Sequence, residues 1–222
     1  MKKLDFKMTL YYHNIMLMGN QGEGKTHKGR GILELYPNVE RWIWSPQRPL
    51  ENFEGYGQEV TTLDELDGGG FKIWNGDYGE KTFAKFQTLA MKNKDLWLII
   101  DDCHEQCTKQ MIPPEWKTTI LSGRNRGIFS MFLTPHPNQV HNTILGSCQH
   151  TFAFKLGLES HIEWVRKNLM GDEAWILLPS TQRKVNDPSW PDVLPQRSYL
   201  YRDRSDGENQ LMIAGEDFEV DG

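Results

Sequence analysis

The residues best equipped for chemistry lie near the start of the chain, in the stretch GNQGEGKT from Gly19 to Thr26. It matches the pattern G-x-x-x-x-G-K-[ST], which places a lysine and a hydroxyl group directly after a glycine-rich turn. Glycines let the backbone wrap a phosphate chain with its N–H groups inward, and a helix that begins there adds its positive end. In this pattern Lys25 reaches the β- and γ-phosphates and the Thr26 hydroxyl binds Mg²⁺. We therefore predict a phosphate-binding loop made of Gly19, Asn20, Gln21, Gly22, Glu23, Gly24, Lys25 and Thr26.

Two adjacent acids, Asp101 and Asp102, follow the apolar run LWLII. A phosphate loop needs an acid at the end of a neighbouring buried strand to hold its Mg²⁺, so we predict Asp101 as a metal ligand together with Thr26. Asp102 lies where a second acid can polarise the attacking water. Glu105 is the alternative for that role, because a longer carboxylate one turn further on also reaches the site. Helix capping is the competing structural role for Asp101.

Two arginines, Arg124 and Arg126, precede the apolar run IFSMFLT, which ends at Thr134 in the polar turn TPHPN. A guanidinium is permanently charged and suits the charge that develops on a γ-phosphate, in cis or across a subunit boundary. A residue at the end of the strand beside the magnesium strand can sense the γ-phosphate, and we assign this role to the turn that Thr134 begins. A basic turn before a proline-rich loop is the plain structural alternative.

The elements that must position these groups are short apolar runs alternating with amphipathic segments. Continuously apolar runs are typical of strands buried on both faces, as in a parallel sheet. The alternation predicts an α/β fold of three layers with a mostly parallel central sheet. The expected strands are 14–19, 41–45, 71–75, 96–100, 128–134 and 150–156, and the expected helices are 25–36, 80–93 and 161–170, the last stopped by Gly171.

With 222 residues the chain fits one domain of this kind. We expect an N-terminal segment, 1–14, an ATPase-type domain, 15–206, and an acidic tail, 207–222, with partial disorder as an option for the tail. No apolar run approaches the roughly 18 residues that a membrane span requires, and no signal-peptide core is present, so a cytosolic location is expected. The net charge of −5 argues against a monomer that coats nucleic acid, but not against a ring with lysines in its pore.

Three cysteines, Cys103, Cys107 and Cys148, are too few for a disulfide framework, and their odd number fits a reducing compartment. The stretch CHEQC, from Cys103 to Cys107, looks like a fragment of a metal site. A structural zinc site needs four ligands, and no second cluster completes this one. Ordinary helix residues are the favoured interpretation.

Taken together, strand, GxxxxGKT, helix, hhhhDD, then G-R-x-x-G-I, a strand and T-x-x-P resemble the HerA–FtsK superfamily of ring-forming, DNA-pumping ATPases. Within it, the short length and the double aspartate look most like the genome-packaging ATPases of membrane-containing viruses with double jelly-roll capsids. The resemblance runs from about residue 15 to residue 156, some two thirds of the chain. It implies a P-loop NTPase fold of the RecA-like, ASCE type, with ATP and Mg²⁺ as cofactors.

The resemblance also implies roles for single residues. Gly19, Gly24, Lys25 and Thr26 match the family's phosphate loop, and Asp101 matches its magnesium acid. Arg124 falls at the arginine that members donate to the neighbouring subunit's nucleotide, with Arg126 as the near alternative, and Thr134 matches the start of the sensor turn.

Two departures from the family pattern leave roles open. Members commonly have Asp-Glu where this chain has Asp101-Asp102, so the catalytic base is Asp102 or Glu105. The sensor turn usually reads Thr/Ser-Gln, whereas Pro135 replaces the glutamine here. Either His136 or Asn138 takes over sensing, or that role is absent, and turnover is then slow or tightly gated.

The implied partners are double-stranded DNA, other copies of the chain in a ring expected to be a hexamer, and viral capsid or portal-vertex proteins. The implied setting is the host cytoplasm and the packaging vertex of the virion. Lysines that could face DNA are Lys81, Lys85, Lys92, Lys94, Lys109 and Lys117, although such residues more often keep a helix face solvated. Two other functions stay open: a small nucleotide kinase, and an assembly factor that uses nucleotide binding as a switch with little hydrolysis.

Overall fold

The computed structural model describes residues 10, 12–47, 49–178, 196–205 and 209–212. Within these residues one sheet has the strand order β3-β4-β2-β5-β6-β1-β7-β8-β9. The pairs from β3 to β7 are parallel, whereas β8 pairs with β7, and β9 with β8, in antiparallel fashion. The mostly parallel α/β fold predicted from the sequence is confirmed. The strands are β1 (Asn14–Met18), β2 (Glu40–Trp44), β3 (Gln58–Val60), β4 (Phe71–Trp74), β5 (Leu96–Ile100), β6 (Phe129–Thr134), β7 (Cys148–Phe154), β8 (Tyr199–Asp203) and β9 (Asn209–Met212).

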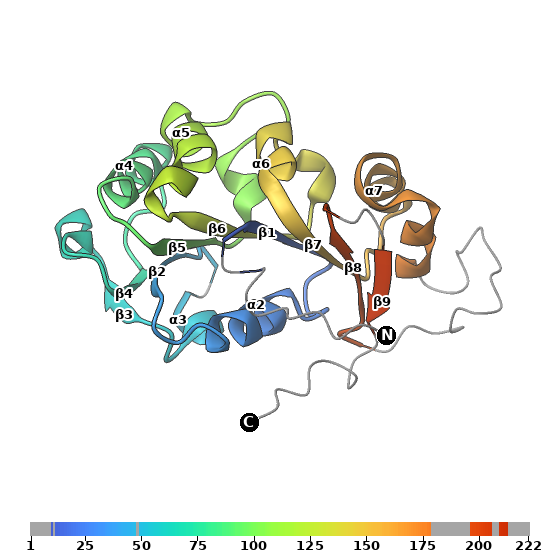
Figure 1. Cartoon of the computed structure of the whole chain (residues 1–222), viewed down its shortest axis with the longest axis horizontal. Helices are drawn as coiled ribbons and strands as arrows, with labels where there is room; N and C mark the ends of the chain where they lie inside the picture. The colour runs from blue at the N-terminus through green and yellow to red at the C-terminus, as the bar shows by residue number, and fades with distance from the viewer. Residues whose placement is uncertain (1–9, 11, 48, 179–195, 206–208, 213–222) are drawn as a thin grey trace.

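Helices cover both faces of the sheet and complete the three layers (Figure 1). One face carries α4 (Glu80–Ala90), α5 (Pro114–Ser122) and α6 (Asn142–Ser147), and the other carries α2 (Lys25–Glu34) and α3 (Pro49–Phe53). Side chains alternate between the faces along each strand. Met16 and Met18 of β1 therefore pack in one core and Ile15 and Leu17 in the other.

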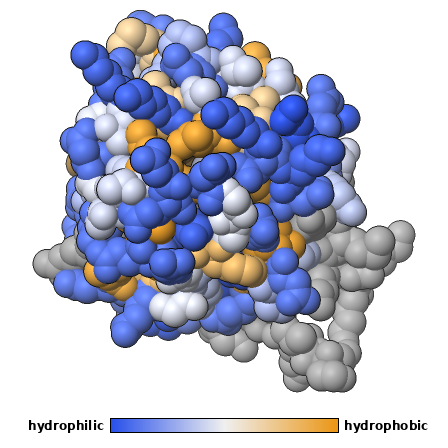
Figure 2. All heavy atoms as spheres, turned by 90° about the vertical axis from the view of Figure 1, so that its left-hand side faces the viewer, coloured by the Kyte–Doolittle hydropathy of each residue, from blue (hydrophilic) through white to orange (hydrophobic). Residues whose placement is uncertain are grey.

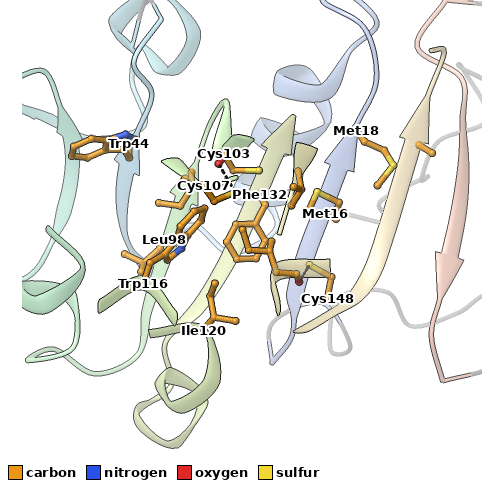
Figure 3. Close-up of a cluster of buried hydrophobic side chains, with 14 of the residues drawn as sticks. Met16, Met18, Trp44, Leu98, Cys103, Cys107, Trp116, Ile120, Phe132 and Cys148 are labelled. Atoms are coloured by element: carbon orange, nitrogen blue, oxygen red, sulfur yellow. Dashed lines mark hydrogen bonds between the residues drawn. The ribbon is translucent and has the colours of Figure 1, made fainter. Parts of the chain in front are cut away.

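The core on the α4–α5 side is rich in aromatic and sulfur-containing side chains (Figure 3). Trp44 stacks on Trp74 with ring planes 3° apart and centroids 6.0 Å apart. Cys103 and Cys107 are buried there, and the Cys107 thiol donates to the Cys103 carbonyl at 3.5 Å. Cys148 is buried too, and its thiol donates to a carbonyl of α6. No group of three or more acidic, histidine or cysteine side chains fit to hold a metal occurs in the part of the chain that the structure describes.

The predicted elements exist, but several end at other residues and one predicted helix is divided in two. The helix expected over 25–36 ends at Glu34, because Pro37 follows shortly and disfavours helical backbone before it. The helix expected over 80–93 ends at Ala90, and the Asn93 side chain donates to a carbonyl of its last turn. The segment expected as one helix, 161–170, divides into α7 (Glu159–Val165) and a π-helix, η5 (Arg166–Met170), before Gly171.

The two edges of the sheet differ in construction. At one edge β3 has only three residues, two of them exposed, and Figure 2 shows mainly hydrophilic side chains with separate apolar patches there. A short polar edge strand resists pairing with other chains. At the other edge β9 occupies 209–212, within the segment expected as an acidic tail, and 213–222 lie outside the described residues. Among the described helices, none has the length and hydropathy needed to cross a membrane.

Candidate functional site

The glycine-rich loop connects the buried end of β1 to the first residue of α2. Two hydrogen bonds to other segments of the chain hold this loop in place. The Gly19 N–H donates to the Thr134 carbonyl at 3.2 Å, and the Asn20 N–H donates to the Lys155 carbonyl at 2.9 Å. Lys25 is 9% exposed, and its Nζ donates to the Gly19 and Asn20 carbonyls at 2.7 and 3.0 Å. Its ammonium group therefore lies within the predicted phosphate-binding loop.

Two glycines of the loop are required by its geometry. A Cβ on Gly19 would lie 2.6 Å from the Cβ of Phe154, so the loop can approach β7 only without a side chain. Gly24 has a φ of 109°, a conformation that costs other residues energy. No side chain caps α2 at Gly24, and the first-turn N–H groups of a helix have no acceptor inside the helix. The loop thus presents backbone donors and a positive helix end to an anion.

Asp101 directly follows β5 and is 5% exposed. Its two carboxylate oxygens accept hydrogen bonds from the Ser45 hydroxyl and the Asp102 N–H, both at 3.0 Å. Burial, with repulsion from Asp102, raises the pKa of Asp101 to about 6, and these hydrogen bonds and Lys25 oppose the shift. A carboxylate that is so poorly solvated is stabilised by a nearby cation.

Lys25 responds to the same surroundings in the opposite sense. Burial lowers the pKa of its ammonium, while the neighbouring carboxylates of Asp101, Asp102 and Glu23 raise it. The phosphate loop and the acidic pair therefore belong to one electrostatic site, as the sequence predicts for Lys25 and Asp101.

Both candidates for the catalytic base, Asp102 and Glu105, line the pocket of this site. Asp102 is half-buried and has a φ of 47°, a left-handed conformation that is rare outside glycine. Burial raises the pKa of Asp102, and Lys25 and His136 lower it. Glu105 is exposed, and one of its oxygens accepts from the Gln47 amide at 3.3 Å.

The polar turn after β6 lies beside the phosphate loop. Thr134 is fully buried; its hydroxyl accepts the His136 N–H at 3.0 Å and lies 3.3 Å from Nδ1 of His104. Pro135 and His136 line the pocket, whereas Asn138 is not among the described residues that line it. Of the two residues considered as replacements for a sensor glutamine, His136 therefore has the better position.

Arg124 and Arg126 lie in a 3₁₀ turn, η3 (Gly123–Arg126), at the start of β6. The phosphate loop meets the opposite end of this strand, at Thr134, and six strand residues span about 17 Å. Neither arginine therefore reaches the loop of its own chain. Nη1 of Arg126 donates to the Met91 carbonyl at 2.7 Å, whereas the Arg124 guanidinium has no hydrogen-bond partner among the described residues.

The sequence patterns did not identify several residues at or next to the pocket. They include Ser45, which holds Asp101, and His104, His161 and Arg197, which line the pocket. A Cβ on Gly24 would lie 3.1 Å from Cγ of Arg197, so this arginine, 173 residues away in sequence, lies against the loop. His104 belongs to the CHEQC stretch, which the sequence analysis interprets as ordinary helix residues in preference to a metal-site fragment. No spacing rule connects His161 or Arg197 to a phosphate loop.

The pocket has a volume of about 830 Å³ and is lined by the loop, both acids and the polar turn. Its lining fits a nucleoside triphosphate with a magnesium ion. The phosphates would meet the loop donors and Lys25, and the Thr26 hydroxyl and the Asp101 carboxylate supply the hard oxygen ligands that Mg²⁺ prefers. A second hollow, of about 880 Å³, lies around Arg41 at the start of β2 and lacks such a loop.

The fold is similar to those of several solved structures. The genome-packaging NTPase B204 of Sulfolobus turreted icosahedral virus 2, in complex with ATP-gammaS, matches with a TM-score of 0.70 and 16% identity over 90% of this chain and 97% of that one. Its complex with AMPPCP matches with a TM-score of 0.72, 16% identity and the same coverage. EssC (ATPases 2 and 3) from Geobacillus thermodenitrificans matches with a TM-score of 0.59 and 13% identity over 92% of this chain and 39% of that one.

No protein-family model matches the chain, and no curated protein matches it by sequence. At the identities found among solved structures, similarity establishes the fold and not the activity. The resemblance to packaging ATPases predicted from the sequence is therefore confirmed at the level of the fold. The B204 structures also contain ATP analogues.

Proposed function

We propose that this chain is a Mg²⁺-dependent ATPase that assembles into a ring, a hexamer, and moves double-stranded DNA into a preformed viral capsid. One observation carries the proposal. The phosphate loop and its acid lie at one end of the strands, and Arg124, without a hydrogen-bond partner among the described residues, lies at the other end. A site that uses Arg124 for its γ-phosphate is completed only by a second copy of the chain.

The proposed chemistry is attack of an oriented water on the γ-phosphate. Lys25 and the loop N–H groups bind the phosphates. Thr26 and Asp101 would hold Mg²⁺, which would supply positive charge to offset that of the phosphates. Asp102 or Glu105 orients the water and accepts its proton. Arg124 of the next subunit stabilises the charge that develops as the γ-phosphate leaves.

The proposed DNA contacts are made by exposed lysines. All six candidate lysines are exposed: Lys81, Lys85, Lys92, Lys94, Lys109 and Lys117. Phosphate contacts by lysine are sequence-independent, as movement along any genome requires. A further structure with a similar fold is described as the DNA-packaging ATPase B204 of Sulfolobus turreted icosahedral virus, and this description favours DNA as a partner. The proposal extends to double-stranded DNA, to capsid or portal-vertex proteins as further partners, and to the host cytoplasm or the virion vertex as the setting.

The first test is the steady-state ATPase rate with Mg²⁺, with and without long double-stranded DNA, across a range of protein concentrations. A motor whose sites are completed in trans gives a rate that rises with DNA and more steeply than linearly with protein. A rate that is linear in protein and indifferent to DNA refutes the motor. Phosphate transfer to an added nucleoside monophosphate indicates a kinase instead, and nucleotide-dependent assembly without turnover indicates a switch.

The second test separates cis from trans action. Lys25→Ala and Arg124→Ala are each expected to lower the rate at least 100-fold, since an arginine finger contributes a factor of about 10³ to 10⁵. Mixing the two variants creates junctions with an intact loop on one side and an intact arginine on the other, so activity returns. Arg126→Ala is the matched control, because this guanidinium already binds the Met91 carbonyl. Failure of the mixture to regain activity contradicts a trans arginine.

A further inference from the structure

Three histidines from separate elements meet at the edge of the pocket. The ring centroids of His104 and His136 are 4.8 Å apart, and those of His136 and His161 are 5.4 Å apart, both pairs edge to face. His104 lies in the short turn after the acidic pair, His136 in the polar turn after β6, and His161 in α7. All three line the nucleotide pocket. His136 is therefore enclosed between two other imidazoles.

The three histidines differ in whether Nδ1 has a hydrogen-bonding neighbour among the described residues. His104 is held by the Thr134 hydroxyl, 3.3 Å from its Nδ1, and the same hydroxyl accepts the His136 backbone N–H. In contrast, Nδ1 of His136 and Nδ1 of His161 are buried without a hydrogen-bond partner among the described residues. His161 is only 4% exposed. A buried polar atom without a partner is costly, and native structures rarely keep one without a reason.

The charge states of His104 and His161 favour hydrogen bonding over ion pairing. Burial, reinforced by His136 and Lys25 against the carboxylate of Glu105, lowers the pKa of His104 to about 4. Burial, together with His136, also lowers the pKa of His161. Both rings are therefore neutral at neutral pH, and a neutral imidazole donates at one nitrogen and accepts at the other. Such a ring orients its neighbour without adding a positive charge that Lys25 already supplies.

The position of His136 indicates which part of a bound nucleotide its side chain would contact. It lies two residues beyond Thr134, whose carbonyl receives the N–H of Gly19, and Gly19 in turn holds Lys25. In a loop of this pattern the lysine marks the β- and γ-phosphates. His136 therefore faces the part of the pocket that a triphosphate fills and a diphosphate leaves to water.

We propose that His161 positions His136 against the terminal phosphate of a bound nucleoside triphosphate, so that the site prefers triphosphate to diphosphate. The inference rests on the proposed nucleotide site and adds its selectivity. His136 touches the phosphate, and His161 acts through His136 from the helix on the far side. The histidines thereby take the place of a side-chain amide in the polar turn.

The test measures the affinities of AMPPCP and ADP, each with Mg²⁺, by calorimetry on the full chain. The wild type binds AMPPCP more tightly than ADP. His161→Leu reduces the ratio of the two dissociation constants by about fivefold to tenfold, the effect of losing one well-placed hydrogen bond, through weaker AMPPCP binding alone. His136→Leu does the same. The double variant loses no more than either single variant, because the two residues act as one unit.

Two conservative variants test position apart from folding. His161→Asn keeps a hydrogen-bonding atom near the place of Nδ1 and retains the preference, whereas His161→Gln moves that atom further out and loses it. His13→Leu is the matched control, since His13 also meets a histidine ring edge to face, with centroids 5.4 Å apart, at the opposite end of the sheet. It leaves the ratio unchanged.

Two kinds of failure are distinguishable. If the wild type binds both nucleotides but His161→Leu and His161→Gln leave the ratio unchanged, or weaken AMPPCP and ADP equally, the inference is overturned and the nucleotide site stands. If the wild type binds neither nucleotide, the proposed site itself is refuted, and the inference with it.

Discussion

Replacing Asp101 by asparagine is expected to stabilise the folded protein at neutral pH while abolishing the proposed ATP hydrolysis. Both polar atoms of the new side-chain amide would have hydrogen-bond partners in the structure. Its carbonyl oxygen can accept the Asp102 N–H, and its NH₂ group can donate to the Ser45 hydroxyl oxygen. That hydroxyl can turn its own proton to the Gln47 carbonyl, which lies 3.4 Å away. The substitution therefore removes a buried charge without leaving a polar atom unpaired.

The magnitude follows from the pKa of Asp101, which burial raises from 3.8 to about 6. The folded state then holds its proton more tightly than the unfolded state, so the contribution to stability is complete below pH 3.8 and is lost as the pH rises through about 6. A shift of about two units at 1.36 kcal/mol each corresponds to about 3 kcal/mol. The Asp101→Asn variant does not lose this free energy of unfolding as the pH rises, because asparagine does not ionise.

Urea unfolding at pH 4, 5, 6 and 7.5, without nucleotide, measures the effect. The free energy of unfolding of Asp101→Asn is expected to exceed that of the wild type by about 3 kcal/mol at pH 7.5, and the two converge near pH 4. Glu105→Gln, an exposed acid of the same pocket, serves as the control and changes the unfolding free energy by less than about 0.5 kcal/mol. A difference that does not vary with pH refutes the assignment of a buried, destabilising charge to Asp101.

Two further substitutions test how the loop and the polar turn are built. Gly19→Ala is expected to cost about 1–3 kcal/mol of unfolding free energy in urea, because the new Cβ would lie 2.6 Å from that of Phe154. Thr134→Val is expected to cost about 1–3 kcal/mol in the same assay, since it deprives the His136 N–H and Nδ1 of His104 of a partner in a fully buried place.

Each of these has a matched control. Gly31→Ala adds a methyl group within α2 where no atom lies within 4 Å, and it is expected to be neutral or to stabilise by about 0.5–1 kcal/mol. Thr118→Val removes an exposed hydroxyl that bonds only within α5, and it is expected to change stability by less than about 0.5 kcal/mol. Equal effects in a substitution and its control would contradict the close packing described for the loop or the turn.

Local patterns in the sequence predicted the sheet and the half of the site that depends on short-range order. The strand, loop and helix around Lys25 are contiguous, and the apolar run before Asp101 indicates a buried strand directly. The far edge was not predicted, because β8 and β9 join in antiparallel fashion, although the alternating aromatic residues of 199–201 were a signal for a strand. His104 and His161 were missed because only tertiary packing brings them to His136.

The stacked indoles of Trp44 and Trp74 are an intrinsic spectroscopic probe next to the site, so that no added label is needed. Trp44 directly precedes Ser45, and its carbonyl accepts the Asp101 N–H at 2.8 Å, so the stacked pair is joined through the backbone to Asp101. Near-ultraviolet circular dichroism depends on aromatic rings held in fixed packing. Coupled transitions of two nearly parallel indoles give a signal that changes when either ring rotates. Ligand binding that rotates either ring is therefore expected to change the near-ultraviolet circular dichroism of the native protein.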